Sequence, residues 1–399
     1  MVDISILGQV ALGYSPFIDR NRAVIATRLG VFPLSSDVTL DAASLLSAIG
    51  EVWPAHGPRV SLNLASEALL LDVLNAKPAN NLMIEVPSFM AGDAAHAGAI
   101  LAAHANGNSL LLKGRPLREL PRDILPCFKF SIIDLGDERR VDGVVPRGVT
   151  RSISVVQAGV RSVADMEKSF ARGSVAVLGW PIDDAVTVAA ENDKGKTPTD
   201  LQVIVQLIHQ VDGEEPVARL ENTLKRDPTL AFKLLRLINS PAFGMQVEVG
   251  SLGHAIMLLG YQRFKRWLAL LLATASKDAN LKPLLFASVR RGLLMEELVR
   301  HTADEEMRNE MFICGVFSLL DRMFRQPFSD LLGSIPVPAR VVQALVKGQG
   351  PFAPYLNLVN ALEDGSPFDL RAASDSLMMG VQEINRALLR ALTAAAQLD

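Results

Sequence analysis

The stretch Asp227-Pro-Thr-Leu-Ala-Phe-Lys-Leu-Leu-Arg-Leu-Ile238 decides the class of the second half of this 399-residue chain. Asp227 suits a helix N-cap, and Pro228 suits the first helical position, where no N–H is needed. Apolar residues then recur at the spacing of one helix face, at Leu230, Leu234, Leu237 and Ile238. The pattern predicts an amphipathic helix whose polar side carries Lys233 and Arg236.

Helical periodicity continues from this stretch toward the C-terminus, with Gly and Pro in the gaps. We expect further helices at residues 261–274, 284–301, 305–324, 339–347, 355–363 and 381–395. Strand patterns are weak throughout this half, so the sequence predicts an all-α domain.

The first 190 residues have a different sequence pattern, in which short apolar runs alternate with segments of helical periodicity. We expect strands at residues 23–29, 60–64, 82–86, 109–113, 130–135, 153–157 and 175–178. Most of these runs begin one strand plus one helix apart, which is typical of a parallel sheet covered by helices. A complete (β/α) barrel needs about 250 residues, so the sequence favours a truncated or degenerate (β/α) TIM-like barrel.

The boundary between the halves is expected at residues 191–199, a charged segment with Gly195, Pro198 and no large apolar residue. The predicted domains are therefore 1–190 for the barrel, 191–199 for a linker and 200–399 for the helical domain. Residues 1–195 carry the whole formal net charge of −3, and residues 196–399 are neutral.

Charge, cysteine spacing and the lengths of apolar runs argue against several classes of function. The mild charge balance disfavours a dedicated nucleic-acid binder. Cys127 and Cys314 are far apart and form neither a disulfide framework nor a zinc motif. No targeting signal and no apolar run of membrane-spanning length is recognised, so a cytoplasmic location without membrane contact is expected.

Chemistry-bearing motifs are scarce. The sequence contains no phosphate-binding glycine loop, no H-E-x-x-H pair and no G-x-S-x-G elbow. Polar residues do occur near the ends of predicted strands, namely Asn63, Glu85 and Asp134, where barrel sites are built. With the nearby Arg28 and Lys113 they form either part of a metal site or a set of buried hydrogen bonds, and the second interpretation is favoured.

The helical half resembles the HDOD domain, a modified HD domain, and the whole chain resembles the EAL–HDOD signalling proteins of bacteria. The resemblance lies in Arg226–Gly244, Ser251–Trp267 and Phe312–Asp321. In the last segment Ser318 and Leu319 stand where HD phosphohydrolases have a metal-binding His and Asp. The resemblance therefore implies an α-helical HD-like fold without its metal site.

The barrel half resembles a degenerate EAL domain, the cyclic-di-GMP phosphodiesterase fold. Thr27-Arg28-Leu29 stands at the Glu-Ala-Leu motif, so Thr27 replaces a metal-ligand Glu. Asn63, Glu85 and Asp134 match other ligand positions, Gln157-Ala-Gly159 stands at an Ala-Glu motif, and the Asp-Asp-Phe-Gly segment has no counterpart. With Thr27, Asn63, Glu85 and Asp134 as vestigial positions, the resemblance implies no catalytic residue, no metal and no cofactor.

These features predict a non-catalytic regulatory protein that acts as a scaffold for other signalling proteins through its HDOD domain. The predicted interaction residues are basic: Lys225, Arg226, Lys233, Arg236, Arg263, Lys265 and Arg266. Alternatives are a cyclic-di-GMP sensor without hydrolysis, which would use Arg28, Asn63 and Glu85, and a weak residual phosphodiesterase. A homodimer is also considered, and nucleic acid is not expected as a partner.

Overall fold

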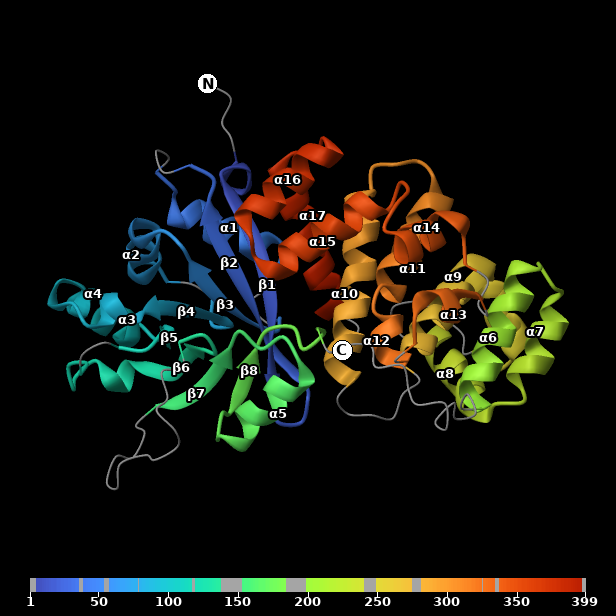
Figure 1. The fold of residues 1–399 in the computed structure, drawn as a ribbon, viewed down its shortest axis with the longest axis horizontal. Helices are drawn as coiled ribbons and strands as arrows, with labels where there is room; N and C mark the ends of the chain where they lie inside the picture. Colours follow the sequence, from blue (N-terminus) through green and yellow to red (C-terminus); the bar gives the residue numbers. More distant parts are fainter. Residues whose placement is uncertain are drawn as a thin grey trace. The chain divides into compact units, whose positions relative to one another are not determined.

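A computed structural model describes residues 5–35, 39–53, 57–77, 79–116, 119–137, 153–183, 199–239, 249–274, 281–324, 326–333 and 337–396 (Figure 1). The chain divides into two compact units. Unit 1 comprises residues 1–184, 282–286 and 354–399, and unit 2 comprises residues 185–281 and 287–353. No helix among the described residues is long and apolar enough to span a membrane.

Unit 1 is built around a closed barrel whose eight strands follow chain order. The strands are β1 Val10–Asp19, β2 Val24–Pro33, β3 Arg59–Leu64, β4 Leu82–Pro87, β5 Ser109–Lys113, β6 Phe128–Asp134, β7 Ser154–Ala158 and β8 Ala176–Leu178. Strands β2 to β8 pair in parallel, whereas β1 is antiparallel to both β2 and β8. The predicted barrel class is confirmed, and all seven predicted strands are present as β2 to β8.

Strand β1 was not predicted, because Gly13, Ser15 and Pro16 interrupt its apolar pattern. A tight turn at residues 20–23 joins β1 to β2. In this turn Asp19 Oδ1 accepts hydrogen bonds from the backbone N–H groups of Asn21 and Ala23. A turn this short leaves no room for a covering helix, unlike the long crossover that joins parallel strands.

The barrel helices are α1 Ala42–Val52, α2 Glu67–Asn75, α3 Ser88–Ala91, α4 Ala94–Ala105 and α5 Val163–Ala171. The described part of the connection from β5 to β6 contains only the short 3-10 helix η2, Leu125–Cys127. This connection therefore has less helical cover than a complete (β/α) unit, which agrees with the prediction of a barrel with lost or shortened helices.

The C-terminal helices α15 Ala353–Asp364, α16 Pro367–Leu377 and α17 Val381–Ala396 belong to unit 1, apart from the first residue of α15. Helices α16 and α17 contact β1, and α17 also contacts α1 and the 3-10 helix η1, Ile6–Gly8 (Figure 1). The sequence had assigned these helices to the domain 200–399. The structure differs because β1 lacks a helix of its own, and these segments bury its apolar outer face.

Asn385 fixes this packing from the middle of α17. Its side chain is fully buried and donates hydrogen bonds to the carbonyls of Leu7 (2.7 Å) and Val10 (2.8 Å). Its Oδ1 accepts the N–H of Leu12 at 3.3 Å. One side chain thus satisfies three backbone groups at the start of β1, and buried backbone groups without partners are costly.

Every secondary-structure element among the described residues of unit 2 is a helix. It contains α6 Thr199–Asp212, α7 Val217–Leu224, α8 Pro228–Ile238, α9 Leu252–Thr274, most of α10 Lys282–Leu298, α11 Glu305–Phe317, α12 Leu320–Phe324, α13 Phe328–Gly333 and α14 Ala339–Lys347. The predicted all-α class is confirmed. Two details differ: α9 extends before a kink at Gly260, and the expected helix 305–324 is interrupted at Ser318 and Leu319. The predicted linker 191–199 lies outside the described residues except for Thr199, so this boundary stays a prediction.

Asn385→Ala is expected to lower the free energy of unfolding by about 3 kcal/mol, because it leaves three backbone groups at η1 and β1 without partners. Urea denaturation followed by circular dichroism measures the change. Asn75→Ala, an exposed position at the end of α2, is the matched control and should change stability by less than about 0.5 kcal/mol. Equal effects at the two positions would contradict the anchoring role of Asn385.

Candidate functional site: the polar interior of the barrel

The barrel interior has an apolar layer and, nearer the C-terminal ends of the parallel strands, a polar layer. Buried side chains from all strands except β3 form the apolar layer: Phe17, Ala26, Met83, Leu111, Ile132, Val156, Ala158, Ala176 and Leu178. Successive side chains of a strand alternate between faces. Arg28, Glu85 and Lys113 therefore share the interior with Ala26, Met83 and Leu111, and lie above them toward the C-terminal ends of the strands.

Glu85 is the centre of the polar part. Its side chain is fully buried, and each carboxylate oxygen has a partner, one from the adjacent strand β3 and one from β2, the strand beyond it. Arg28 donates from Nη2 to Oε2 at 2.6 Å, and Ser61 donates from Oγ to Oε1 at 2.9 Å. A buried carboxylate in a charge-assisted hydrogen bond and a hydroxyl hydrogen bond is electrostatically satisfied.

Lys113 occupies the adjacent position and donates from Nζ to Asn63 Oδ1 at 2.7 Å. The pKa of Lys113 is lowered, chiefly because burial disfavours the ammonium and also because Arg28 repels it. The carboxylate of Glu85 acts in the opposite direction. Two cationic side chains thus share the interior with one carboxylate.

The four vestigial ligand positions do not lie together in the structure. It brings Asn63 and Glu85 together in the interior, but Thr27 is buried on the opposite face of β2 from Arg28. Asp134 is exposed and accepts the backbone N–H of Gly136 at 2.8 Å, which fixes the turn after β6. Gln157 donates to the carbonyl of Ile133 at 2.7 Å, so its side chain is used within the sheet.

This arrangement does not fit a divalent metal. Metal ions of this kind prefer several oxygen ligands with free lone pairs. Here Asn63 and Glu85 already accept hydrogen bonds from Lys113 and Arg28, whose charges would repel a metal ion. No group of three His, Cys, Asp or Glu side chains in the described part of the chain is arranged to hold one.

The HD-like segment is also used structurally. Ser318 Oγ donates to the carbonyl of Gly315 at 2.7 Å and accepts a hydrogen bond from Arg291 Nη1 at 3.1 Å. Leu319 is buried in the apolar core of unit 2. Burial raises the pKa of Asp321, and the nearby cations Arg322 and Arg291 oppose that shift. Ser318 and Leu319 therefore complete the break between α11 and α12 rather than offer ligands.

The predicted basic residues do not form one uniform group. Arg226, Lys233 and Arg263 are exposed, and Lys225 pairs with Glu221 at 2.7 Å on the surface of α7. Lys265 and Arg266 are partly buried in ion pairs with Asp212 and Glu296, and Arg266 also stacks 3.8 Å from the ring centroid of Phe312. The side chain of Arg236 lies outside the described part. Lys265 and Arg266 thus have structural partners, while the interaction role of all seven residues stays a prediction.

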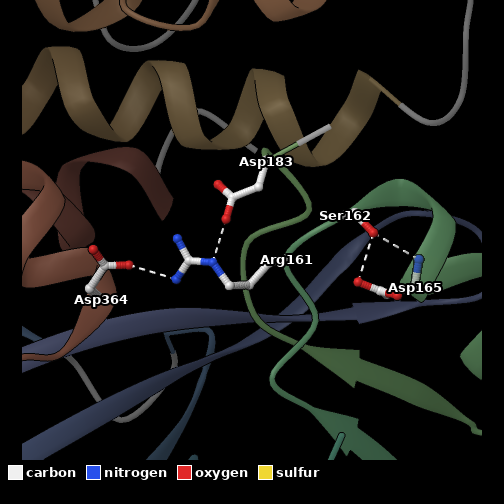
Figure 2. Close-up of polar contacts among 5 residues, drawn as sticks. All are labelled: Arg161, Ser162, Asp165, Asp183 and Asp364. Carbon is white, nitrogen blue, oxygen red and sulfur yellow. Dashed lines mark hydrogen bonds and ion pairs between the residues drawn. The ribbon is translucent and has the colours of Figure 1, made fainter. Parts of the chain in front are cut away.

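Figure 2 shows a polar cluster that the sequence did not predict. Arg161, in the loop after β7, pairs with Asp183 after β8 and with Asp364 at the end of α15, the latter at 2.8 Å. Hydrogen bonds from both carboxylates raise the pKa of Arg161. The next residue, Ser162, caps α5 by accepting the N–H of Asp165 at 3.0 Å. The Ser-x-x-Asp spacing signals the cap, but nothing local signals the partner 203 residues away.

Comparison with known proteins finds a domain family and several similar chains. Residues 197–324 match the HDOD domain family. The chain is similar to the uncharacterized protein YuxH of Bacillus subtilis, with 29% identity over 168 residues that make up 40% of each protein. It is also similar to the cyclic di-GMP phosphodiesterase CdgJ of Vibrio cholerae, with 26% identity over 162 residues, 40% of this chain and 38% of CdgJ. The matches thus span about two-fifths of these relatives' own lengths.

The chain is also similar, over less than half of its length, to two solved structures. One is the PaMucR phosphodiesterase in complex with c-di-GMP, with 17% identity, a TM-score of 0.33, and coverage of 44% of this chain and 96% of that one. The other is a standalone EAL protein from Vibrio cholerae O395 in its c-di-GMP-bound form, with 15% identity, a TM-score of 0.31, and coverage of 43% and 89%.

In class, the chain is a closed eight-stranded barrel joined to a helical domain. Residues 197–324 are an HDOD domain, so the resemblance of the helical half is confirmed. The barrel beside it has the architecture that the resemblance to EAL–HDOD proteins implies.

Removing Arg28 alone tests the charge pair. Arg28→Ala leaves the buried Glu85 carboxylate without its cation and should cost about 3–5 kcal/mol of unfolding free energy at pH 7. The double variant Arg28→Met/Glu85→Leu should recover most of that loss, because no uncompensated charge remains. Urea titrations of wild type, both single variants and the double variant give the coupling energy, and additive losses would contradict the pairing.

Lys113 gives a pH test. In the window between its lowered pKa and the ordinary value of 10.5, the unfolded chain binds more protons at this site than the folded chain. The free energy of unfolding of wild type minus that of Lys113→Gln should therefore rise with pH within this window. Urea titrations at pH 8, 9 and 10 measure it. A flat or falling curve for Lys113→Gln, or a rise of the same size for the exposed control Lys77→Gln, would refute the lowered pKa of Lys113.

Proposed function

We propose that this chain is a non-catalytic regulatory protein of the EAL–HDOD type, which acts by binding other signalling proteins. One observation carries the proposal: both oxygens of Glu85, a matched ligand position, are held by Arg28 and Ser61. An arginine and a lysine supply fixed positive charge where a metal-dependent phosphodiesterase would need ligands for cations. Such a site has no means to activate water by metal coordination.

The HDOD domain supports the same proposal from the other half. Its HD positions are a capping hydroxyl at Ser318 and a core side chain at Leu319. Two enzyme-type folds without ligand sets favour binding over chemistry, although a fold does not by itself fix a function. In this proposal, the exposed Arg226, Lys233 and Arg263 of unit 2 are the contacts for acidic partner surfaces.

A cyclic-di-GMP sensor is the second candidate, and one observation favours it. Arg28, Lys113 and Glu85 leave one net positive charge in the barrel interior when all are ionised, and the buried Nε of Arg28 has no hydrogen-bond partner among the described residues. A phosphate group would find complementary charge there. The relatives CdgJ and PaMucR are named for cyclic di-GMP chemistry or its complex.

The full-length protein should not linearise cyclic di-GMP with either Mg²⁺ or Mn²⁺, and calorimetry should detect no Mn²⁺ binding that depends on Glu85. Chromatography of the reaction products measures the activity, with Glu85→Gln as the matched variant. Turnover that Glu85→Gln abolishes would refute the non-catalytic proposal. Binding of the dinucleotide without turnover, lost in Arg28→Ala but kept in the exposed control Arg371→Ala, would make the sensor the better account.

A further inference from the structure

Lys113 is the last residue of β5, so its amine lies at the end of the barrel where barrel proteins bind their ligands. Its Nζ donates to Asn63 Oδ1 at 2.7 Å. Both oxygens of Glu85 already accept hydrogen bonds from Arg28 and Ser61. The amine is therefore held in place by a neutral amide, and it makes no ion pair with any described residue.

The charges of this interior do not cancel. When all three groups are ionised, Arg28 and Lys113 supply two positive charges and Glu85 supplies one negative charge. Away from bulk water such an imbalance is poorly screened. Burial and the charge of Arg28 both disfavour the ammonium form of Lys113, which are the two means by which a lysine becomes a nucleophile.

The two cations can be reached from solvent, whereas the carboxylate cannot. The side chain of Arg28 keeps 19% of its area exposed, and Lys113 is also partly exposed. Glu85 is fully buried beneath them. A small solute that enters at the C-terminal ends of the strands thus meets an amine and a guanidinium first.

A lysine amine reacts reversibly with a carbonyl compound. The nitrogen adds to the carbonyl carbon, one N–H proton passes to the carbonyl oxygen, and the resulting hydroxyl leaves as water with the second N–H proton. A C=N bond to the lysine remains, and this imine takes up a proton from water. The protonated imine of a neutral aldehyde or ketone keeps the surplus charge of the interior. If a carboxylate is attached next to the carbonyl, the adduct, Arg28 and Glu85 together have no net charge.

We propose that Lys113 captures small 2-oxo acids as an imine, with the carboxylate of the bound molecule next to Arg28. The bound molecule is small because Lys113 and Arg28 are only partly exposed. No bond of the 2-oxo acid other than its C=O bond is broken. The inference stands apart from the proposed regulatory function, and it holds whether or not the protein binds cyclic di-GMP.

The test uses the full-length protein with pyruvate and sodium cyanoborohydride, which reduces the imine to a stable secondary amine. Peptide mass mapping then locates the label. We expect at least about tenfold more label on Lys113 than on the exposed Lys77, since only Lys113 has a cationic neighbour that the carboxylate can approach. Methyl pyruvate has the same ketone without the charge, so it should lower the ratio of label on Lys113 to label on Lys77 at least about threefold.

Lys113→Gln should remove the label at this site, and the matched variant Lys77→Gln should leave it unchanged, with circular dichroism as the check on folding. The peptide map of the wild-type protein decides the outcome even if Lys113→Gln does not fold. Equal labelling of Lys113 and Lys77 by pyruvate would overturn the proposal. An equal ratio with methyl pyruvate would overturn it as well, because the carboxylate would then play no part.

Discussion

The reversed direction of β1 is the constraint on which unit 1 depends. Because β1 pairs antiparallel with both β2 and β8, it closes the barrel through a tight turn and receives no crossover helix. Its apolar outer face still needs cover, and α16 and α17 provide it from more than 350 residues away. Asn385 makes the contact specific, since its amide satisfies both polarities of backbone group at the start of the strand. Close approach is also needed at Gly13, where a Cβ would lie 2.7 Å from the Cα of Gly365.

The polar interior follows from a charge balance rather than from a ligand set. A buried Glu85 without a counter-charge would be strongly destabilising, and a metal ion is one way to supply that charge. In this chain Arg28 supplies it from β2, across the intervening strand β3, and Ser61 of β3 donates a hydrogen bond to the second oxygen. The guanidinium of an arginine is covalently attached to the chain and cannot coordinate water. A bound metal ion can exchange its ligands with water and substrate. The Glu85 carboxylate therefore has its counter-charge within the barrel, from a side chain of this chain.

Sequence patterns predicted what local periodicity controls. The seven parallel strands, the helix at Pro228–Ile238 and the all-α class of the second half follow from apolar spacing and capping residues. Strand β1 was not predicted because Gly13, Ser15 and Pro16 interrupt its apolar pattern. The helix break at Ser318 was not predicted because the segments on both sides of it are helical and apolar. The grouping of residues 354–399 with the barrel depends on one buried amide and on long-range packing. No local pattern contains that information.

The site was predictable by residue type and only partly by partner. Asn63 and Glu85 were identified from their places at strand ends, and the structure puts both in the interior. Their partners depend on strand register: Arg28 faces inward and Thr27 outward, a choice that a one-residue shift would reverse. Lys265 and Arg266 show the same limit in unit 2, since sequence alone gives two cations but not the acidic residues that neutralise them.

The packing of α17 also gives unit 1 a thermodynamic property that neither fold class implies. Asn385 and Thr393 hold the helix against η1, β1 and α1. Since α17 covers the strand that closes the barrel, undocking of this helix would expose the outer face of β1 and leave backbone groups at its start without partners. The stability of the barrel is therefore coupled to the docking of a helix from the far end of the chain.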